Sequence, residues 1–410
     1  MYRTLILFSL IFFSSFGVSQ QTICLNMIVK NEAAIIRRCL DSVKEIIDYW
    51  VIVDTGSIDG TQEIIKEHMK EIPGELHERP WINWGETRSE AFEAAKGKGD
   101  YILFMDADDI LEFDEGFSMP ELTEDLYSMW RGTQSFSYLK PQIVKGNLPW
   151  KWIGVTHEYL GCDSETTSAI FEGVRYVSID DGATRRDPEK YWKNVRLLEE
   201  GLKKEPNHSR YMFYLAESYR DAGERAKALE WFQKRVKMGG WEEEIYWSKL
   251  QIGQMLRALE LPNAIVIEGF KDAFQFRPHR AEAPYFLAEL YNSMGEYAKA
   301  YEILKIRECI PKPAEKDSLF NMDWIEDYGL LFQLSICSYY VEQYQESLDV
   351  CNQLLANAAL PEEWRKIAES NRMFPLEKLQ SFPNVQRTVD KGSQESLLPR
   401  SKKTDRNAGS

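Results

Sequence analysis

Short apolar runs alternate with amphipathic segments along residues 22–106, and this alternation limits the fold more than any other feature of the chain. The runs TICLNMIV, WVIVDTGS and YILFMD are typical of buried strands, and GELHERP adds a less apolar one. The segments between them place apolar side chains on one helical face, as Ile36, Leu40 and Val43 do. Such alternation predicts a mostly parallel α/β sheet covered by helices, with ligands bound at the carboxyl ends of the strands.

From residue 186 onward the pattern is helical only, and one unit of it recurs. YLAESYRDAGERAKALEWF, which begins at Tyr214, aligns with FLAELYNSMGEYAKAYEIL, which begins at Phe286, and a weaker copy lies between Ile336 and Cys351. Each full copy has a glycine that permits a turn and an alanine that lets two helices approach: Gly223 and Gly295, and Ala228 and Ala300. We predict an all-α solenoid of hairpins similar to tetratricopeptide repeats. The alternative is an unrelated helical bundle.

These patterns divide the 410 residues into four parts. We predict a signal peptide or hydrophobic N-terminus at 1–19, an α/β domain at 20–185, a helical-repeat domain at 186–380 and a disordered polar tail at 381–410. In the first part a basic residue is followed by the apolar run LILFSLIFF and then by small residues. This order is typical of a signal peptide. An uncleaved membrane anchor is the alternative, and no later segment is long and apolar enough to span a bilayer.

Charge and cysteine content exclude some partners. The formal net charge is −15, so the surface repels phosphate backbones and we expect no nucleic-acid partner. Six cysteines form no CxxC pair and no dense framework, and they do not indicate a redox compartment.

Three carboxylates follow the apolar run Tyr101–Met105 directly: Asp106, Asp108 and Asp109. Two aspartates at positions i and i+2 after a strand can both point at one hard cation, and oxygen ligands suit Mn²⁺ or Mg²⁺. The cation would offset the charge that develops on a leaving diphosphate. A solvated acidic turn is the alternative, but the strand before it and the βαβ context favour a metal site.

The N-terminal half resembles glycosyltransferase family 2, the inverting transferases of the GT-A fold, which is a Rossmann-like nucleotide-diphospho-sugar transferase fold. The resemblance rests on MIVKNEAAIIRRCLDSV, VIVDTGSIDGT and WGETRSEAFEAAKGKGDYILFMDADD, in this order. The helical half, with DGATRRDPEKYWKNVRLLEEGL and RYMFYLAESYRDAGE, resembles members of the family that are fused to tetratricopeptide repeats. Some bacteriocin peptide S-glycosyltransferases have a similar plan. The similarity covers roughly Ile23 to Leu355.

The resemblance implies a site for a nucleotide-sugar donor, with a UDP-sugar expected. Asp54 would contact uracil or ribose, Asp106 would meet ribose and diphosphate, and Asp108 would be the principal metal ligand. Arg88 would approach the nucleotide, although a surface ion pair is the alternative for it. The remaining donor-site residues that we expect are Asn31, Glu32, Gly56, Ser57, Asp59, Arg185 and Arg186. The last two would clamp the diphosphate or, equally, begin the repeat domain.

LPWKWIGVTHEYL, from Leu148 to Leu160, is the expected acceptor side of the site. Trp150 and Trp152 would be flat surfaces for a sugar or peptide, and Asp109 is assigned to the same acceptor or sugar region. By resemblance, His157 would be a third metal ligand and Glu158 the catalytic base, although these two roles could be exchanged. A buried core histidine is the alternative for His157.

We therefore expect a metal-dependent, inverting glycosyltransferase that moves one sugar to a peptide or protein acceptor held by the repeats. The Gln/Arg-x-x-Arg-Trp motif of processive members is absent, which favours transfer of a single sugar. The alternatives are a glycan or lipid-linked acceptor, or a non-catalytic scaffold with a decayed transferase domain. The repeats could instead form a homodimer interface. The N-terminus leads us to expect a secretory-pathway lumen or a membrane-anchored form, with the cytoplasm as the alternative.

Overall fold

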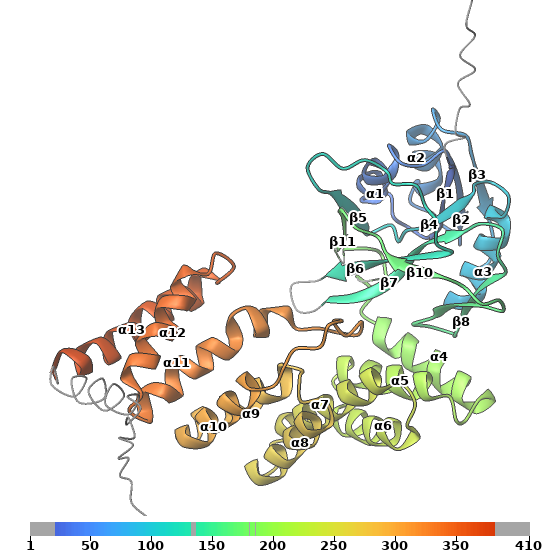
Figure 1. Cartoon of the computed structure of the whole chain (residues 1–410). Coiled ribbons are helices and arrows are strands. Elements are labelled where there is room, and N and C mark those ends of the chain that lie inside the picture. The colour runs from blue at the N-terminus through green and yellow to red at the C-terminus, as the bar shows by residue number, and fades with distance from the viewer. Residues whose placement is uncertain (1–20, 133–136, 180, 185, 382–410) are drawn as a thin grey trace, which may run out of the picture. The chain divides into compact units, whose positions relative to one another are not determined.

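The computed structural model describes residues 21–132, 137–179, 181–184 and 186–381 (Figure 1). The chain forms two compact units, one made of residues 1–133 and 138–204 and the other of residues 134–137 and 205–410. The division falls after Lys204, whereas the sequence placed it between 185 and 186. Helix α4 (Lys190–Lys204) therefore belongs to the first unit. The predicted signal peptide and residues 382–410 of the predicted tail lie outside the described residues, and Ser381 is the last residue of a helix.

The first unit is built on a nine-stranded sheet and a two-stranded hairpin within the described residues. The path through the sheet is β3-β2-β1-β4-β7-β6-β11-β5, with β10 paired to β6, and β8 pairs with β9. The strands are β1 (Ile23–Val29), β2 (Tyr49–Asp54), β3 (Gly74–Glu78), β4 (Tyr101–Phe104), β5 (Asp109–Phe113), β6 (Leu126–Gly132), β7 (Ser137–Lys145), β8 (Trp150–Ile153), β9 (Tyr159–Cys162), β10 (Ser168–Ile170) and β11 (Val174–Ser178).

The predicted strands form the parallel part of this sheet. β1 pairs in parallel with β2 and β4, and β2 pairs in parallel with β3. The rest of the sheet is mixed, because β7 is antiparallel to β4 and β5 is antiparallel to β11. Parallel neighbours end at one edge, so the residues that follow β1, β2 and β4 meet there.

Helices cover both faces of the sheet. α1 (Ile36–Val43) and α2 (Thr61–His68) pack on one face, where Leu25 and Met27 of β1 join Leu40 and Ile65 in one core. α3 (Trp84–Ala95) packs on the other face, where Phe92 and Ala95 meet β4 and β8. Side chains of a strand alternate between faces, which is why β1 contributes to both cores.

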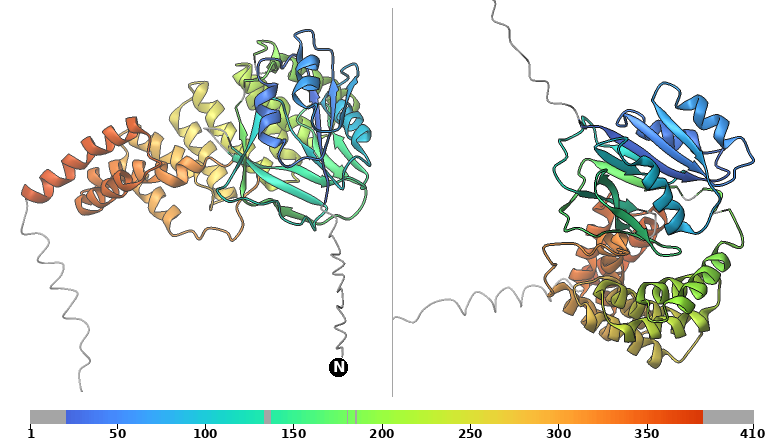
Figure 2. Two further views of the ribbon diagram at one scale, coloured as in Figure 1. Left: turned by 90° about the horizontal axis from the view of Figure 1, so that it is seen from above. Right: turned by 90° about the vertical axis from the view of Figure 1, so that its right-hand side faces the viewer.

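The second unit is a helical solenoid of four hairpins and a last helix, within the described residues; Figure 2 shows it from two further directions. The helices are α5 (Ser209–Asp221), α6 (Arg225–Met238), α7 (Glu242–Ala258), α8 (Asn263–Phe276), α9 (Glu282–Ser293), α10 (Tyr297–Glu308), the π-helix η1 (Ile325–Gly329), α11 (Leu330–Tyr340), α12 (Tyr344–Ala356) and α13 (Glu362–Ser381). The solenoid prediction is confirmed: Ala228 and Ala300 are fully buried, and Gly223 and Gly295 make the turns at φ of +83° and +74°. In the part of the chain that the structure describes, no helix combines the length and the apolar character needed to cross a membrane.

Candidate active site

The carboxyl edge of β1, β2 and β4 gathers most of the residues that the sequence assigned to the donor. Val29 of β1 pairs with Asp54 of β2, and Asn26 of β1 pairs with Phe104 of β4. Asn31 and Glu32 therefore lie beside Asp54, and Asp106 follows two residues after β4. The sheet register alone places these groups at one edge.

Asp54 is fully buried at the end of β2 and holds the turn that follows. Its Oδ1 accepts hydrogen bonds from the backbone N–H of Gly56 (2.9 Å) and Ser57 (2.8 Å), and from Nε2 of Gln62 (3.1 Å). Gly56 has φ of +102°, a conformation that glycine adopts readily. Oδ2 of Asp54 is also buried, and it has no hydrogen-bond partner among the described residues. One carboxylate oxygen is therefore left for a donor from outside the chain.

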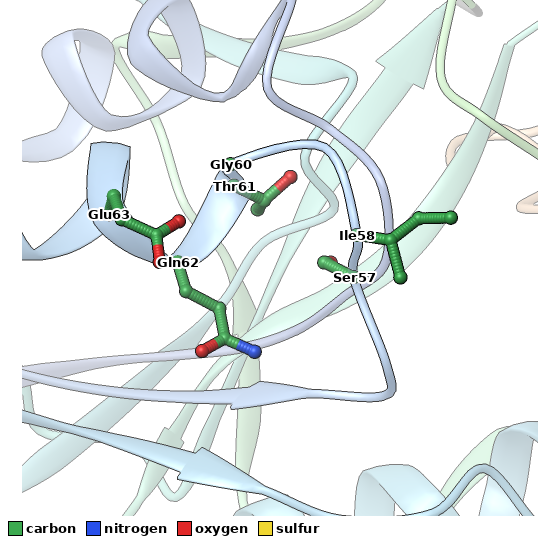
Figure 3. A pocket seen from close by; sticks show the side chains of 6 residues that line it. All are labelled: Ser57, Ile58, Gly60, Thr61, Gln62 and Glu63. Carbon is green, nitrogen blue, oxygen red and sulfur yellow. The ribbon is translucent and has the colours of Figure 1, made fainter.

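Side chains of the β1 and β2 loops fix one another. Oδ1 of Asn31 accepts a hydrogen bond from the backbone N–H of Ile58 (2.9 Å), and the Asn31 N–H donates to Ser57 Oγ (2.8 Å). Asp59 accepts hydrogen bonds from the backbone N–H of Ala33 and Thr61, both at 3.1 Å. These bonds brace the start of α2. A recess opens there, lined by Ser57, Ile58, Gly60, Thr61, Gln62 and Glu63 (Figure 3).

Asp106 lies in a cluster of cations. Arg88, from α3, donates through Nη2 to Asp106, Lys140 Nζ lies 3.0 Å from Oδ2, and Arg131 Nη1 lies 3.6 Å from Oδ2. Burial alone would raise the pKa of Asp106, but these three cations hold that pKa well below its usual range. Burial lowers the pKa of Lys140 in turn. The aspartate is therefore ionised and its charge is already offset by the protein.

Asp109 is fully buried and belongs to the interior rather than to an acceptor pocket. Its Oδ1 accepts from Arg131 Nη2 (2.9 Å) and its Oδ2 accepts from the Tyr176 hydroxyl (2.7 Å). Burial raises the pKa of Asp109 to about 6. Its expected contact with sugar or acceptor is thus wrong, because Arg131 and Tyr176 occupy both carboxylate oxygens and no part of the side chain is exposed.

Asp108 differs from its two neighbours, because no ion pair is found for it among the described residues. The loop after β11 covers it: a side chain at Gly182 would collide with Oδ2 of Asp108 at 2.8 Å. Burial and the charge of Asp106 raise the pKa of Asp108. Glu32 lies under the same loop and accepts the backbone N–H of Ala183 at 3.0 Å, and burial raises the pKa of Glu32 to about 7. This side of the site has an excess of negative charge.

The expected three-ligand metal set is not assembled in the described residues. His157 is exposed, has φ of +51°, and its Nε2 lies 3.5 Å from Nδ2 of Asn194. No group of three or more His, Cys, Asp or Glu side chains in the described part of the chain is placed to hold an ion. Asp106 is held by cations, so Asp108 is the member of the set whose carboxylate suits a hard cation.

Glu158 lies next to the donor edge through Arg88. Arg88 Nε donates to Oε1 of Glu158 (2.7 Å) while its Nη2 contacts Asp106, so one guanidinium joins the two carboxylates. Arg88 is 8% exposed, and its ring neighbours are Trp84 and Trp152. The alternative of a surface ion pair for Arg88 is thus wrong: the pair is buried.

The two tryptophans of the acceptor-side stretch are core residues. Trp150 and Trp152 are 2% and 6% exposed and pack with Phe92 and Phe104 against α3. The expectation that they offer stacking surfaces is wrong, because β8 alternates and both indoles face inward. Arg185 lies outside the described residues. Arg186 is exposed in a turn, where its backbone N–H donates to the Gly182 carbonyl (3.2 Å).

Sequence reasoning missed Arg131, Lys140 and Tyr176. They lie on β6, β7 and β11, three strands that the sequence analysis did not predict. A signal was present, since Arg131 and Lys140 are cations inside the strand-like runs LYSMWRG and SYLKPQIVK. A cation in the middle of a buried strand needs an anionic partner.

The fold and the site together define a nucleotide-binding type of α/β domain followed by helical repeats. Residues 24–117 match the model of the family described as "Glycosyl transferase family 2". This segment of the first unit is thus similar to family 2 glycosyltransferases, and the helical hairpins follow it in the chain.

The curated relatives that match this chain are named for repeats or for glycosyl transfer. A TPR repeat-containing protein of Synechococcus elongatus is 30% identical over 134 residues, which is 33% of this chain and 31% of that protein. An uncharacterized glycosyltransferase of Rickettsia felis is 31% identical over 28% of this chain and 37% of its own length. The SPbeta prophage-derived glycosyltransferase SunS of Bacillus subtilis is 25% identical over 52% of this chain and 53% of its own length. The chain thus spans about a third to a half of the length of these relatives.

Solved structures similar to this chain include helical-repeat proteins. A thermophilic TPR protein of Thermus thermophilus is 18% identical, with a TM-score of 0.32, and the match covers 45% of this chain and 91% of that one. The C-terminal part of a TPR repeat-containing protein of Cytophaga hutchinsonii is 11% identical with a TM-score of 0.36, covering 50% and 76%. Likenesses this distant carry no weight for function.

Proposed function

We propose that the chain transfers a single sugar, with inversion, from a nucleotide-sugar donor, with UDP as the expected nucleotide. The observation that carries the donor assignment is Asp54, whose buried Oδ2 has no partner among the described residues. A pyrimidine ring N–H would donate to this oxygen. A buried acceptor without a donor is unfavourable by about 1–3 kcal/mol, so such a bond would contribute to donor affinity. Asn31, Ser57 and Gln62 keep the surrounding loop in place.

Glu158 is proposed as the group that removes the acceptor proton. Arg88 fixes its Oε1, and the same guanidinium fixes Asp106 at the donor edge, so the base and the donor site share one rigid support. A base must lie within hydrogen-bond reach of the proton that it removes, and a fixed carboxylate meets this requirement better than a mobile one. Arg88 acts here as a positioning residue.

Asp108 is proposed as the carboxylate that holds Mn²⁺ or Mg²⁺ together with the donor. Its half-buried carboxylate has no ion pair among the described residues, and its pKa is raised by partial burial and by Asp106, so a cation nearby would relieve unfavourable charge. When bound, a divalent cation offsets the charge of a leaving diphosphate. Asp106 has a different part in this proposal: it orients Arg88 and Lys140.

The acceptor is proposed to be a peptide or protein that the helical repeats help to recruit, because stacked hairpins present an extended surface. The test of transfer measures release of nucleoside diphosphate from a panel of nucleotide sugars, in Mn²⁺ or in EDTA. We expect turnover of one donor with Mn²⁺ and little turnover in EDTA. Asp108→Ala should lower turnover about 100-fold or more.

Asp163→Ala is the matched control, because Asp163 is an exposed acidic residue of the same unit, paired only with exposed Lys151 among the described contacts. It should retain wild-type turnover. Equal turnover by wild type and Asp108→Ala would reject the role of Asp108. Absence of turnover and of binding for every donor would favour the scaffold alternative.

A further inference from the structure

Residues 317–322, between α10 and η1, have no helix and lie across three hairpins of the second unit. The Phe320 ring packs against Phe213 of α5 (centroids 6.2 Å apart) and Trp247 of α7 (5.0 Å). The backbone that follows reaches Glu282 at the start of α9. The segment thus contacts the first helix of three successive hairpins.

Side chains of α7, of α9 and of the connection before α9 bond to the backbone of the segment. Glu243 Oε2 accepts the N–H of Leu319 (2.7 Å), and Glu282 Oε1 accepts the N–H of Met322 (3.2 Å). Arg280 donates to the carbonyls of Leu319 (3.3 Å) and Phe320 (2.9 Å). Hydrogen bonds to main-chain groups do not depend on which side chains a peptide carries, so they suit an extended ligand of varied sequence.

Two side chains of the segment add selectivity. The Asp317 carboxylate lies between two arginines, 2.5 Å from Arg277 Nη2 and 2.9 Å from Arg280 Nη1. Burial alone would raise the pKa of Asp317, but the two arginines lower it, so the residue is an anion. The helical unit therefore binds a carboxylate and, three residues later in the segment, an aromatic ring.

Arg280 and Glu282 on the receiving side also pair with each other and not only with the segment. Arg280 and Glu282 are 5% and 3% exposed, and Nη2 of Arg280 donates to Oε1 of Glu282 (2.8 Å). The Tyr246 hydroxyl holds the other Glu282 oxygen (3.0 Å). Bonds to each other and to Tyr246 restrain Arg280 and Glu282 independently of the segment, which favours a preformed binding site.

The segment itself is held in an unfavourable conformation. Phe320 has φ of +47°, a region that residues other than glycine rarely adopt. Residues 311–316, which precede the segment, are exposed. The contacts impose the conformation, and a ligand that displaces the segment must also break the two backbone hydrogen bonds between Asn321 and Ser137, at 2.7 and 2.8 Å.

We propose that this face of α5, α7 and α9 is a binding site for extended peptides of the type Asp-x-x-Phe, and that residues 317–322 occupy it in cis. The ligand class follows from the two arginines, the two aromatic rings and the backbone contacts. A partner with this sequence pattern would displace the segment. The site uses no residue of the proposed transfer site, so peptide binding can be measured separately from sugar transfer.

Displacement is tested with a fluorescent peptide that has the sequence of residues 314–323. Full-length Asp317→Ala/Phe320→Ala vacates the two side-chain positions, and we expect this variant to bind the peptide at least about tenfold more tightly than wild type, by fluorescence anisotropy. A control peptide with the aspartate changed to asparagine and the phenylalanine to alanine should bind about tenfold more weakly. Equal binding of the two peptides, or no binding by a variant with wild-type circular dichroism, would overturn the proposal.

A second measurement uses the wild-type chain and avoids any folding defect of the variant. Excess peptide should accelerate hydrogen exchange of the amides of Leu319 and Met322, which Glu243 and Glu282 now hold, and leave exchange in α6 and α8 unchanged. Unchanged exchange of both amides at saturating peptide would show that the segment is a fixed structural element.

Discussion

Arg88 is the residue on which the site depends most. It is buried and bonds to both Asp106 and Glu158, which come from different parts of the chain. Around it, the acids Asp106, Asp109 and Glu158 are matched by Arg88, Arg131 and Lys140. A balanced cluster of this kind tolerates burial, whereas loss of one member leaves a charge without a partner.

Replacement of Arg88 by alanine is expected to destabilise the first unit by about 3–5 kcal/mol, because Glu158 loses its partner and Asp106 loses one of its three cations. Denaturant unfolding followed by circular dichroism measures this change. Arg175→Ala is the matched control: its ion pair with Glu112 is exposed, so the free energy of unfolding should change by about 1 kcal/mol or less. Similar losses for both variants would contradict the central place of Arg88.

At the scale of elements, the helical hairpins share one turn. The backbone N–H of Glu224, Leu261, Glu296 and Gln343 each donates to the carbonyl five residues earlier, at 2.8–3.1 Å. The residue before each donor has a positive φ: Gly223, Glu260, Gly295 and Glu342. The turn geometry is thus common to all four hairpins, while the sequence uses glycine in only two.

This turn gives opposite predictions for two substitutions. Gly223→Ala should lower the free energy of unfolding by about 1 kcal/mol, because alanine disfavours φ of +83° although its Cβ would meet nothing within 4 Å. Glu342→Gly should raise it by about 0.5 kcal/mol, since relief of strain exceeds the entropy cost of glycine. Urea denaturation of both variants measures the changes. If both substitutions changed the free energy of unfolding in the same direction, side-chain contacts and not backbone conformation would determine the turn.

The contact between α5 and α7 makes the helical unit sensitive to pH. Burial raises the pKa of Glu217 to about 7, while Arg220 partly offsets this effect and Asp221 adds to it. The folded state therefore holds the proton more tightly than the unfolded chain, and stability should rise as pH falls from about 7 to about 4.5.

Glu217→Gln removes this titration and keeps an oxygen that can accept from Trp247 Nε1, which now lies 3.1 Å from Oε1. At pH 8 we expect the free energy of unfolding of the variant to exceed that of wild type by up to about 3 kcal/mol. Near pH 5 the two free energies should be equal. Thermal unfolding across this pH range makes the comparison. A variant that is less stable than wild type at pH 8 would show that the ion pair with Arg220 outweighs burial.

At the scale of the whole molecule, the chain consists of two compact units with separate cores. Units that bury their own apolar surface can unfold in separate steps. We expect calorimetry to resolve two unfolding transitions, one for each unit. UDP with Mn²⁺ should raise the midpoint temperature of the first unit only. Phe320→Ala should lower the midpoint temperature of the second unit only. A single transition that responds to both changes would show that the units unfold together.

Prediction from sequence succeeded where a pattern is local. The strand that ends at Asp54, the strand just before Asp106 and the two glycine turns each follow from periodicity or from a residue with one conformational role. It failed for Trp150, Trp152 and Asp109, because burial depends on which strands pack over a side chain. β5 through β11 have short or charged runs, and their pairing joins segments far apart in the chain.

The sequence by itself determined that an α/β sheet with an acidic edge precedes stacked helical hairpins, because hydrophobic periodicity fixes which elements form. Only the tertiary structure decided that Asp106 is held by Arg88, Arg131 and Lys140, and that no such ion pair forms at Asp108 among the described residues. The reason is electrostatic: the state of a carboxylate depends on charges brought within a few ångströms by folding, and spacing along the chain does not encode that distance.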